Sequence, residues 1–317
     1  MKNVSFIIPN YNAESTVSKT VESILKQRYK GKFEIIVIDD KSTDKSVKVL
    51  SKFKKYKNFR LIKNEKNIGL ASSLNKAIKL SKYDVLAIVW CDFVLVGEDW
   101  LNKMIEKFSS DNKIACVMSN LMLPKEVWKK YDFWNKVNTI EEYNRSVKGK
   151  VFGKLTLFDK NKIKEVGMYD SKTFRTAGED TDLRLKLLKR NYKIVLEDTK
   201  IVHLHGFYKL SLLDRLFRKA LPLAEASGVL FRKHFYLNSK YRNALVYSFI
   251  YLFALVPNFI QPLFLVILGL ILFTHMFSVF KHVKDIKILL VPFYKLFKDL
   301  ISLFGFWKGF ITGKQEF

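Results

Sequence analysis

Short apolar runs alternate with amphipathic segments along about the first 200 residues of the chain. The apolar runs are rich in Ile, Val and Phe, which is typical of buried strands. Strands are expected at residues 4–8, 33–38, 59–62, 85–90, 194–196 and 201–203. Between the runs, apolar side chains recur at helical spacing, which predicts helices. Helices are expected at residues 15–27, 43–56, 70–81, 99–108 and 181–190.

This alternation of strand and helix predicts an α/β fold with a mainly parallel sheet that is covered by helices. The predicted strands are continuously apolar, as are parallel strands that are buried on both faces. In such sheets, ligands bind beyond the carboxyl ends of the strands. Polar side chains stand at these ends, at Asn10, Asp39, Asp40, Asn64 and Asp92.

The C-terminal third contains a long stretch without charge. No residue from 243 to 280 is charged at neutral pH, and a helix needs about 20 residues to cross a bilayer core of about 30 Å. Residues 259–280 meet that length, whereas 244–256 are short for a crossing, and Pro257 and Pro262 interrupt the stretch. A transmembrane or re-entrant helical hairpin is therefore expected at 243–280. A buried hairpin of a soluble protein is the alternative.

The net charge is +26, from 56 Lys and Arg against 30 Asp and Glu, and so large a surplus indicates an anionic partner. Basic residues flank 243–280 on both sides, which favours cytoplasmic flanks and an even number of crossings. Residues 207–242 and 281–317 mix Leu and Phe with Lys and Arg at helical spacing. We expect basic amphipathic helices there, lying against anionic membrane lipids. Solvated basic helices are the alternative.

Two further observations narrow the setting. Met1 leads directly into the first predicted strand, without the long apolar region of a secretory signal, so we expect the N-terminal domain to stay in the cytoplasm. The sequence contains no nucleic-acid-binding module, so nucleic acid is not expected as the anionic partner.

Five short segments, in order along the chain, resemble the motifs of glycosyltransferase family 2. They are PNYN at 9–12, VIDDKSTD at 37–44, NIG at 67–69, Asp92, and GEDTDL at 178–183. Each segment is weak by itself, but the ordered set is specific, and the match covers about residues 2–206. The resemblance implies the GT-A fold, with a Rossmann-like nucleotide-binding sheet, and inverting transfer of a sugar from a nucleotide-sugar donor.

The resemblance also implies which residues bind the donor. The expected nucleotide-sugar-binding residues are Pro9, Tyr11, Asn12, Asp39, Asp40, Asn67, Gly69 and Asp92. Asp40 would bond to the base or ribose, and Gly69 would let the backbone approach the diphosphate at a helix start. Asn12 can instead cap the following helix, and Asp39 can be a plain turn residue after a strand.

A divalent metal, Mn²⁺ or Mg²⁺, is the cofactor that the resemblance implies. Asp92 matches the last acid of the family's DxD motif, whereas Trp90 replaces its first acid and Lys41 replaces a usual glycine. His203 matches a histidine that closes the metal site in relatives. Asp92 and His203 are therefore the expected ligands, and a histidine ligand slightly favours Mn²⁺. A structural role for His203 is the alternative.

Three carboxylates, those of Glu179, Asp180 and Asp182, crowd the start of the helix expected at 181–190. Negative charge is favourable there, so helix capping is one interpretation, but the cluster exceeds what one cap needs. Transfer to a hydroxyl needs a general base. By the resemblance, Asp180 is that catalytic base, and Glu179 orients the acceptor or Asp180. Arg184 is expected to pair with Asp180 or to bind phosphate, and Asp182 to lie on the same acceptor side.

These expectations divide the chain into regions. They are a GT-A catalytic domain at 1–206, made of a nucleotide-binding half at 1–120 and an acceptor half at 121–206, basic interface helices at 207–242, the hairpin at 243–280, and a basic amphipathic tail at 281–317. Within the acceptor half, residues 121–150 are rich in Trp, Tyr, Asn and Lys and predict an irregular segment.

The expected function is glycosyl transfer to a hydroxyl of a lipid-linked or membrane-associated glycan, at the cytoplasmic face of the cell membrane. One alternative is a polyprenyl-phosphate glycosyl synthase of the same fold, whose anionic acceptor needs no base. Another is a catalytically weak, membrane-docked protein that binds sugar nucleotides, because Trp90 and Lys41 depart from the family pattern.

Overall fold

The computed structural model describes the chain except for residues 148–151, 205–210, 237–238, 256, 258 and 317. The chain forms two compact units. Unit 1 consists of Met1–Val127, Arg145–Ser171 and Glu179–Tyr208, and unit 2 of Trp128–Asn144, Lys172–Gly178 and Lys209–Phe317.

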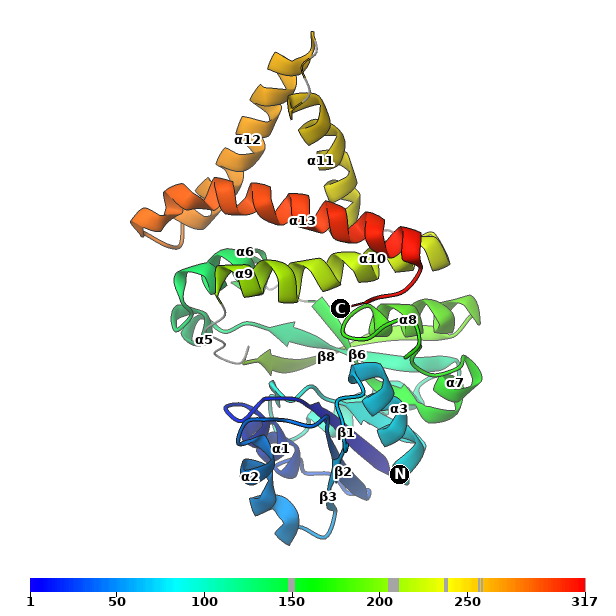
Figure 1. Cartoon of the computed structure of the whole chain (residues 1–317). Helices are drawn as coiled ribbons and strands as arrows, with labels where there is room; N and C mark the ends of the chain where they lie inside the picture. The colour runs from blue at the N-terminus through cyan, green and yellow to red at the C-terminus, as the bar shows by residue number, and fades with distance from the viewer. Residues whose placement is uncertain (148–151, 205–210, 237–238, 256, 258, 317) are drawn as a thin grey trace. The chain divides into compact units, whose positions relative to one another are not determined.

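Eight strands form one sheet in the described part of unit 1, in the order β3-β2-β1-β4-β7-β6-β8-β5 (Figure 1). They are β1 (Val4–Asn10), β2 (Phe33–Asp39), β3 (Phe59–Lys63), β4 (Val85–Ile88), β5 (Phe93–Leu95), β6 (Ile114–Met122), β7 (Phe152–Asp159) and β8 (Lys193–His203). β1 pairs in parallel with β2 and β4, β2 with β3, and β6 with β8, which confirms the mainly parallel sheet. β7 runs antiparallel to β4 and β6, and β5 antiparallel to β8.

Helices cover both faces of this sheet, as the alternation predicted. On one face lie α1 (Val17–Leu25), α2 (Ser46–Ser51), the 3₁₀ turn η1 (Lys52–Lys55) and α4 (Trp100–Ser109). On the other lie α3 (Leu70–Leu80), α7 (Lys160–Glu165) and α8 (Glu179–Lys189) (Figure 1). α1 shows the cause: Val17, Val21 and Ile24 share one helix face and are fully buried. Burial of each such side chain stabilises the folded state by about 1.5–3 kcal/mol.

Two predictions of secondary structure were wrong. Residues 121–150 contain two helices, α5 (Lys125–Lys129) and α6 (Phe133–Val147), where an irregular segment was expected. α6 buries side chains at helical spacing, but polar residues between them hide the pattern. The two short strands expected at 194–196 and 201–203 are the single strand β8, which pairs with β6 across a register shift.

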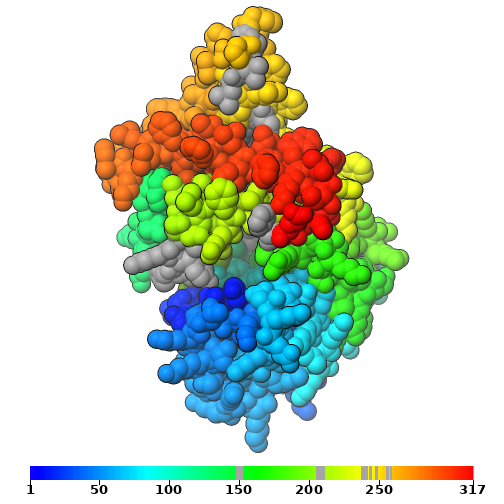
Figure 2. Space-filling model, in the orientation of Figure 1, coloured from blue at the N-terminus to red at the C-terminus, as the bar shows by residue number. Residues whose placement is uncertain are grey.

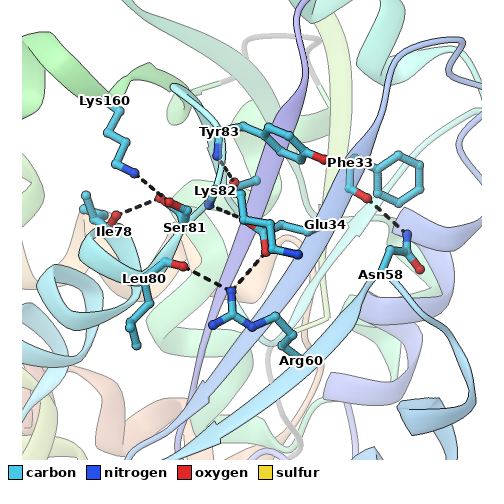
Figure 3. Close-up of polar contacts among 11 residues, drawn as sticks. Phe33, Glu34, Asn58, Arg60, Ile78, Leu80, Ser81, Lys82, Tyr83 and Lys160 are labelled. Atoms are coloured by element: carbon cyan, nitrogen blue, oxygen red, sulfur yellow. Dashed lines mark hydrogen bonds and ion pairs between the residues drawn. The ribbon is translucent and has the colours of Figure 1, made fainter.

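A buried carboxylate holds together the amino-terminal ends of the strands. Glu34, at the start of β2, is 3% exposed. Its oxygens accept hydrogen bonds from the Ser5 hydroxyl at 2.7 Å, the Lys82 backbone N–H at 2.6 Å and the Arg60 guanidinium at 3.1 Å (Figure 3). Nearby, the Lys160 ammonium donates to the Ser81 carbonyl at 2.7 Å. This network joins β1, β2 and β3 to the loop after α3.

Unit 2 is helical in its described part. Its main elements are α6, α9 (Leu212–Arg215), the π-helical turn η2 (Leu216–Ala220), α10 (Leu221–His234), α11 (Ser239–Leu255), α12 (Gln261–Phe280), the 3₁₀ turn η3 (Ile286–Leu290) and α13 (Val291–Thr312). α6 is bonded to α13 through Asn138, whose side-chain oxygen accepts from the Tyr294 hydroxyl at 2.9 Å and the Lys298 ammonium at 2.6 Å.

Two helices of unit 2, α10 and α13, pack backbone against backbone. A Cβ atom added at Gly309 would lie 2.1 Å from the Glu225 carbonyl oxygen, and one at Gly228 would lie 1.9 Å from that of Phe306. Both distances are far below van der Waals contact, so this approach requires glycine at both positions. Beside this contact, the fully buried Glu225 carboxylate pairs with Lys308 at 2.8 Å.

The C-terminal tail of unit 2 holds residues 173–177, which precede the carboxylate cluster in the sequence. The Gln315 side-chain oxygen accepts hydrogen bonds from the backbone N–H groups of Arg175 and Thr176, both at 2.8 Å. The Gln315 side-chain amide donates to the Pro222 carbonyl at 2.9 Å. Because Gln315 is buried, these bonds are shielded from water and fix the backbone of the segment.

One helix in the described part of the chain, α12, is long and apolar enough to cross a membrane. Only 11% of its most apolar stretch is buried, whereas the core helix of a soluble domain is mostly buried. α11 precedes it and packs against it, as a hairpin requires. α13 forms a continuous surface band next to this hairpin (Figure 2). Large apolar side chains are exposed along it, at Phe293, Phe297, Phe304, Trp307 and Ile311.

Candidate active site

The carboxyl ends of four parallel strands meet at one edge of the sheet in unit 1. The register aligns Asn10 at the end of β1 with Asp39 at the end of β2, and Asp39 with Lys63 at the end of β3. β4 pairs with β1 on its other side and leads into Trp90 and Asp92. The polar residues that sequence places at strand ends therefore lie along a single edge.

Asp39 is built into the turn that follows β2. Its carboxylate accepts hydrogen bonds from the Asn10 side-chain amide at 2.7 Å and the Ser42 hydroxyl at 2.5 Å, and it is 2% exposed. The Asn12 side-chain oxygen accepts the Thr43 N–H at 2.8 Å, so Asn12 braces this turn and does not cap the following helix. These contacts support a structural role for Asp39.

The two loops at this edge have left-handed backbone at Asn12, with φ +50°, and at Lys41, with φ +65°. Glycine tolerates this region best, which explains why glycine suits the position that Lys41 occupies here. Tyr11 is 49% exposed beside this turn, whereas Pro9 is buried within β1. Tyr11 is therefore more accessible to a ligand than Pro9.

Asp40 anchors the loop before α3. Its carboxylate accepts hydrogen bonds from the Asn64 side chain and from the backbone N–H groups of Ile68 and Gly69, each at 2.9 Å. The Asn67 side chain donates to the Asp40 carbonyl at 3.2 Å. Asp40 is 5% exposed. An ionised carboxylate accepts about four hydrogen bonds, so these three leave room for about one more.

Asp92 and His203 are brought together by strand pairing. β5 and β8 are antiparallel, and Phe93 lies opposite His203. The Asp92 carboxylate therefore lies 3.0 Å from the His203 Nε2 atom, with the two side chains 21% and 20% exposed. A carboxylate oxygen and an imidazole nitrogen suit Mn²⁺ or Mg²⁺. The described residues contain no group of three or more acidic, His or Cys side chains that could hold a metal ion.

Lys154 and Asp180 form an ion pair near Asp92. The Lys154 ammonium lies 2.8 Å from the Asp180 carboxylate and 4.9 Å from the centre of the Trp90 ring. Burial raises the pKa of Asp180, but the charge and the hydrogen bond of Lys154 lower it by more. The pKa of Asp180 therefore lies below its ordinary value. Burial likewise lowers the pKa of Lys154, and Asp180 more than restores it. Both groups therefore stay ionised.

Glu179 is a buried acid at the start of α8. It is 4% exposed, and its Oε2 atom accepts no hydrogen bond from the described residues. Burial first, and then the charge of Asp180, raise the pKa of Glu179 to about 7. A carboxyl group that is partly protonated near neutral pH can both donate and accept a hydrogen bond.

Two further residues were expected beside Asp180. Asp182 is fully buried and pairs with Lys186 at 3.1 Å, and its expected place on the acceptor side stays a prediction. Arg184 makes no ion pair with Asp180, whose partner is Lys154, so the expected pairing along the helix was wrong. The part of that expectation in which Arg184 binds phosphate stays a prediction.

Lys154 is the residue that sequence reasoning missed. Its ammonium contacts Asp180, and the charges of Asp180, Glu179 and Asp92 all raise its pKa. β7 runs antiparallel to its neighbours, and its first residues therefore lie at the carboxyl edge of the parallel strands. The sequence carries no signal for this, because Lys154 belongs to no recognised motif.

Comparisons with known proteins show which proteins this chain is similar to. The family model described as glycosyl transferase family 2 matches residues 5–160. The poly-beta-1,6-N-acetyl-D-glucosamine synthase of Staphylococcus epidermidis is 31% identical over 208 residues, which cover 62% of this chain and 48% of that protein. The synthase of the same name from Staphylococcus aureus strain COL is 29% identical over the same length. The chain thus spans about half the length of these curated relatives.

Solved structures show the same fold. The mannosyltransferase PcManGT from Pyrobaculum calidifontis, in complex with GDP-Man and Mn²⁺, is similar with a TM-score of 0.56 and 14% identity, over 97% of this chain and 86% of that one. GalNAc-T7 with UDP, GalNAc and Mn²⁺ is similar with a TM-score of 0.54 and 17% identity, over 73% and 48%. Residues 5–160 therefore form a domain of glycosyltransferase family 2, and the chain has the GT-A fold.

Proposed function

We propose that this chain is an inverting glycosyltransferase that moves a sugar from a nucleotide-sugar donor to a hydroxyl of a lipid-linked or membrane-bound glycan. The observation that carries the proposal is the ion pair of Asp180 with Lys154, close to the Asp92–His203 pair. An ionised and partly exposed carboxylate can act as a general base, and the neighbouring pair can hold a cation.

On the donor side, the exposed Tyr11 ring and the remaining acceptor position of Asp40 would receive the nucleoside. The diphosphate would lie towards Asp92 and the N-terminus of α3, where Gly69 has φ +84° and its backbone can come close to an anion. Asp92 and His203 would hold a Mn²⁺ or Mg²⁺ ion, which when bound neutralises charge on the diphosphate. The Mn²⁺ in both similar solved structures supports this proposal.

On the acceptor side, Asp180 would remove the proton of the attacking hydroxyl. The acceptor oxygen forms a bond to the anomeric carbon while the bond from that carbon to the diphosphate breaks, and the nucleoside diphosphate leaves. One displacement of this kind inverts the anomeric configuration. Glu179, with its pKa raised to about 7 by burial and by Asp180, would hydrogen-bond to the acceptor and orient it.

The membrane would supply the acceptor. α12 is long and apolar enough to span, and the exposed apolar side chains of α13 share unit 2 with it. The surplus of 56 basic over 30 acidic residues favours contact with anionic lipids. We infer that α11 and α12 insert as a hairpin, that α10 and α13 lie at the membrane surface, and that the catalytic domain faces the cytoplasm.

Donor binding tests the proposal. The full chain in detergent is titrated with UDP-N-acetylglucosamine, GDP-mannose or dTDP-glucose in the presence of Mn²⁺, and thermal unfolding is recorded. A ligand stabilises the folded state by mass action, so we expect one donor to raise Tm. Asp92→Ala should abolish the rise, whereas the control Asp111→Ala, at an exposed ion pair with Lys193, should retain it. Absence of stabilisation by every donor would contradict the proposal.

Two other functions each have their own test. A polyprenyl-phosphate acceptor is already an anion, so transfer to polyprenyl phosphate that survives Asp180→Asn would favour a synthase of that kind. Trp90, which removes an acid from the DxD motif, favours a sugar-nucleotide-binding protein with weak activity. Donor binding without transfer to a panel of glycan and lipid acceptors would support that function.

Membrane insertion is tested on the full chain. Leu270, 58% exposed in the middle of α12, is changed to Arg, and Leu188, 41% exposed in α8, receives the same change as a control. Arg at the centre of an inserted helix costs about 2.5–3.5 kcal/mol. We expect Leu270→Arg to reduce the fraction recovered in membranes and Leu188→Arg to leave it unchanged. Extraction of the unaltered chain by salt alone would contradict insertion.

A further inference from the structure

Position 90 lacks the acid of the family motif and carries an aromatic ring that contacts a lysine. Trp90 replaces the first acid of the DxD motif, and the Lys154 ammonium lies 4.9 Å from the centre of its ring. An ammonium group is attracted to the face of an indole ring, so Trp90 holds the Lys154 ammonium in a cation–π contact. The two residues come from different strands, since Trp90 follows β4 and Lys154 is in β7, which pair as neighbours.

The replacement of the first DxD acid by Trp90, with Lys154 beside it, makes the charge around position 90 more positive. An acid would add a negative charge that helps to hold a divalent metal, whereas Lys154 brings a positive charge and is already attracted by Asp180, Glu179 and Asp92. A donor diphosphate is the strongest anion that the proposed reaction brings here. Lys154 is 25% exposed and has a flexible stem, so its ammonium can reach a bound anion.

We propose that Lys154, held against the Trp90 ring, binds the diphosphate of the donor. Its positive charge would replace part of the charge that a metal held by two acids of a DxD motif supplies. This inference rests on the proposed function. Lys154 would then exchange its partner when the donor binds, from the Asp180 carboxylate to the diphosphate oxygens. Asp180 would lose its counter-ion at the moment when it must accept the proton of the acceptor hydroxyl.

Nucleoside diphosphate binding tests this role. UDP, GDP and dTDP are titrated into the full chain in detergent by calorimetry, for the unaltered protein, Lys154→Met, Lys154→Arg and the control Lys193→Met. Lys193 also forms an ion pair, at 2.6 Å from Asp111, but lies at the beginning of β8. We expect Lys154→Met to weaken binding at least about tenfold, since it removes a charge-assisted hydrogen bond. Lys154→Arg should restore part of the affinity, and Lys193→Met should bind normally.

The outcomes separate this inference from the proposed function. Unchanged affinity in Lys154→Met, with loss of binding in Asp92→Ala, would overturn the role of Lys154 and leave the proposed function intact. Failure of the unaltered protein to bind any of the three nucleotides would overturn both. Thermal unfolding of each variant without nucleotide shows whether it is folded.

Mn²⁺ affinity tests the substitution of a lysine for an acid. Free Mn²⁺ is measured by electron paramagnetic resonance during titration of the unaltered chain and of the double variant Trp90→Asp, Lys154→Ala. The double variant restores the acid and removes the competing cation, so we expect it to bind Mn²⁺ several-fold more tightly. Equal affinity in both proteins would show that position 90 does not influence the metal site, and would overturn the proposed exchange.

Discussion

Glu34 and Glu179 are the same kind of residue with almost the same burial, at 3% and 4% exposed, but they have opposite surroundings. Glu34 receives three hydrogen bonds, one of them from its counter-ion Arg60. Glu179 stands beside the charged Asp180, and one of its oxygens has no donor in the described part of the chain. A buried acid that is fully bonded stabilises a fold, whereas one with an open acceptor position and a raised pKa is suited to chemistry.

The position of each acid in the sheet explains this difference. Glu34 begins β2 at the amino-terminal edge, where backbone N–H groups and neighbouring strands supply donors. Glu179 begins α8, and its neighbour Asp180 bonds to Lys154, which lies at the carboxyl-terminal edge. In α/β sheets this second edge binds ligands, so polar groups there are available for a substrate.

Removal of the Glu34 carboxylate should have the largest effect on stability. Glu34→Ala leaves the Ser5 hydroxyl, the Lys82 N–H and the Arg60 guanidinium without their buried partner. We expect a loss of about 3 kcal/mol in the free energy of unfolding, measured by denaturant titration. Donor binding should be retained wherever the variant is folded. A loss of less than about 0.5 kcal/mol would break the contrast with Glu179.

Glu179 should make stability depend on pH in the opposite sense to an ordinary paired acid. Its pKa is raised from 4.5 to about 7, so between these values the folded state binds more protons than the unfolded state. The free energy of unfolding therefore falls as the pH rises through this window, by an amount on the order of 2 kcal/mol. Glu179→Gln should remove this part of the fall in unfolding titrations at pH 5 and pH 8. The same fall in both proteins would contradict the raised pKa.

Lys154 should set the acid side of the pH–rate profile. Its charge and hydrogen bond lower the pKa of Asp180 in the donor-free protein, so Lys154→Met should raise that pKa and move the acid limb of kcat/KM, which reports the free enzyme, to higher pH. The control Lys186→Met removes a lysine that pairs with Asp182 instead. It should leave the acid limb in place. An equal displacement in both variants would mean that the profile does not report Asp180.

Asp182 should behave like Glu34 on a smaller scale, although it belongs to the same helical turn as Glu179. It is fully buried and pairs with Lys186. Asp182→Asn should cost about 1 kcal/mol of stability and change transfer less than about threefold, as measured by unfolding and by initial rates. A large loss of transfer with unchanged stability would place Asp182 in the reaction.

Sequence periodicity predicted the parallel half of the sheet, because β1 to β4 are continuous apolar runs that packing alone explains. It missed α6, whose buried face is interrupted by polar residues, and the strands β5, β6 and β7. The predicted proximity of Asp92 and His203 came from the resemblance, and the structure places them 3.0 Å apart. Their roles in metal binding stay predictions.

Contacts that depend on the three-dimensional register were beyond the sequence. Lys154 reaches Asp180 only because β7 runs antiparallel between β4 and β6. The Asp40 carboxylate accepts hydrogen bonds from the backbone N–H groups of Ile68 and Gly69, which are 28 and 29 residues further along the chain. Periodicity reports which side chains are buried, but it carries no information about such distant partners.

Transfer by Asp180→Asn tests the central claim most directly. Donor affinity and the rate of sugar transfer are measured together, for the unaltered chain and for this variant. The amide keeps the size of the side chain but cannot accept a proton, so donor affinity should stay within a few-fold while transfer falls by about 10²–10⁴. Full transfer activity in Asp180→Asn would contradict the assignment of Asp180 as the base.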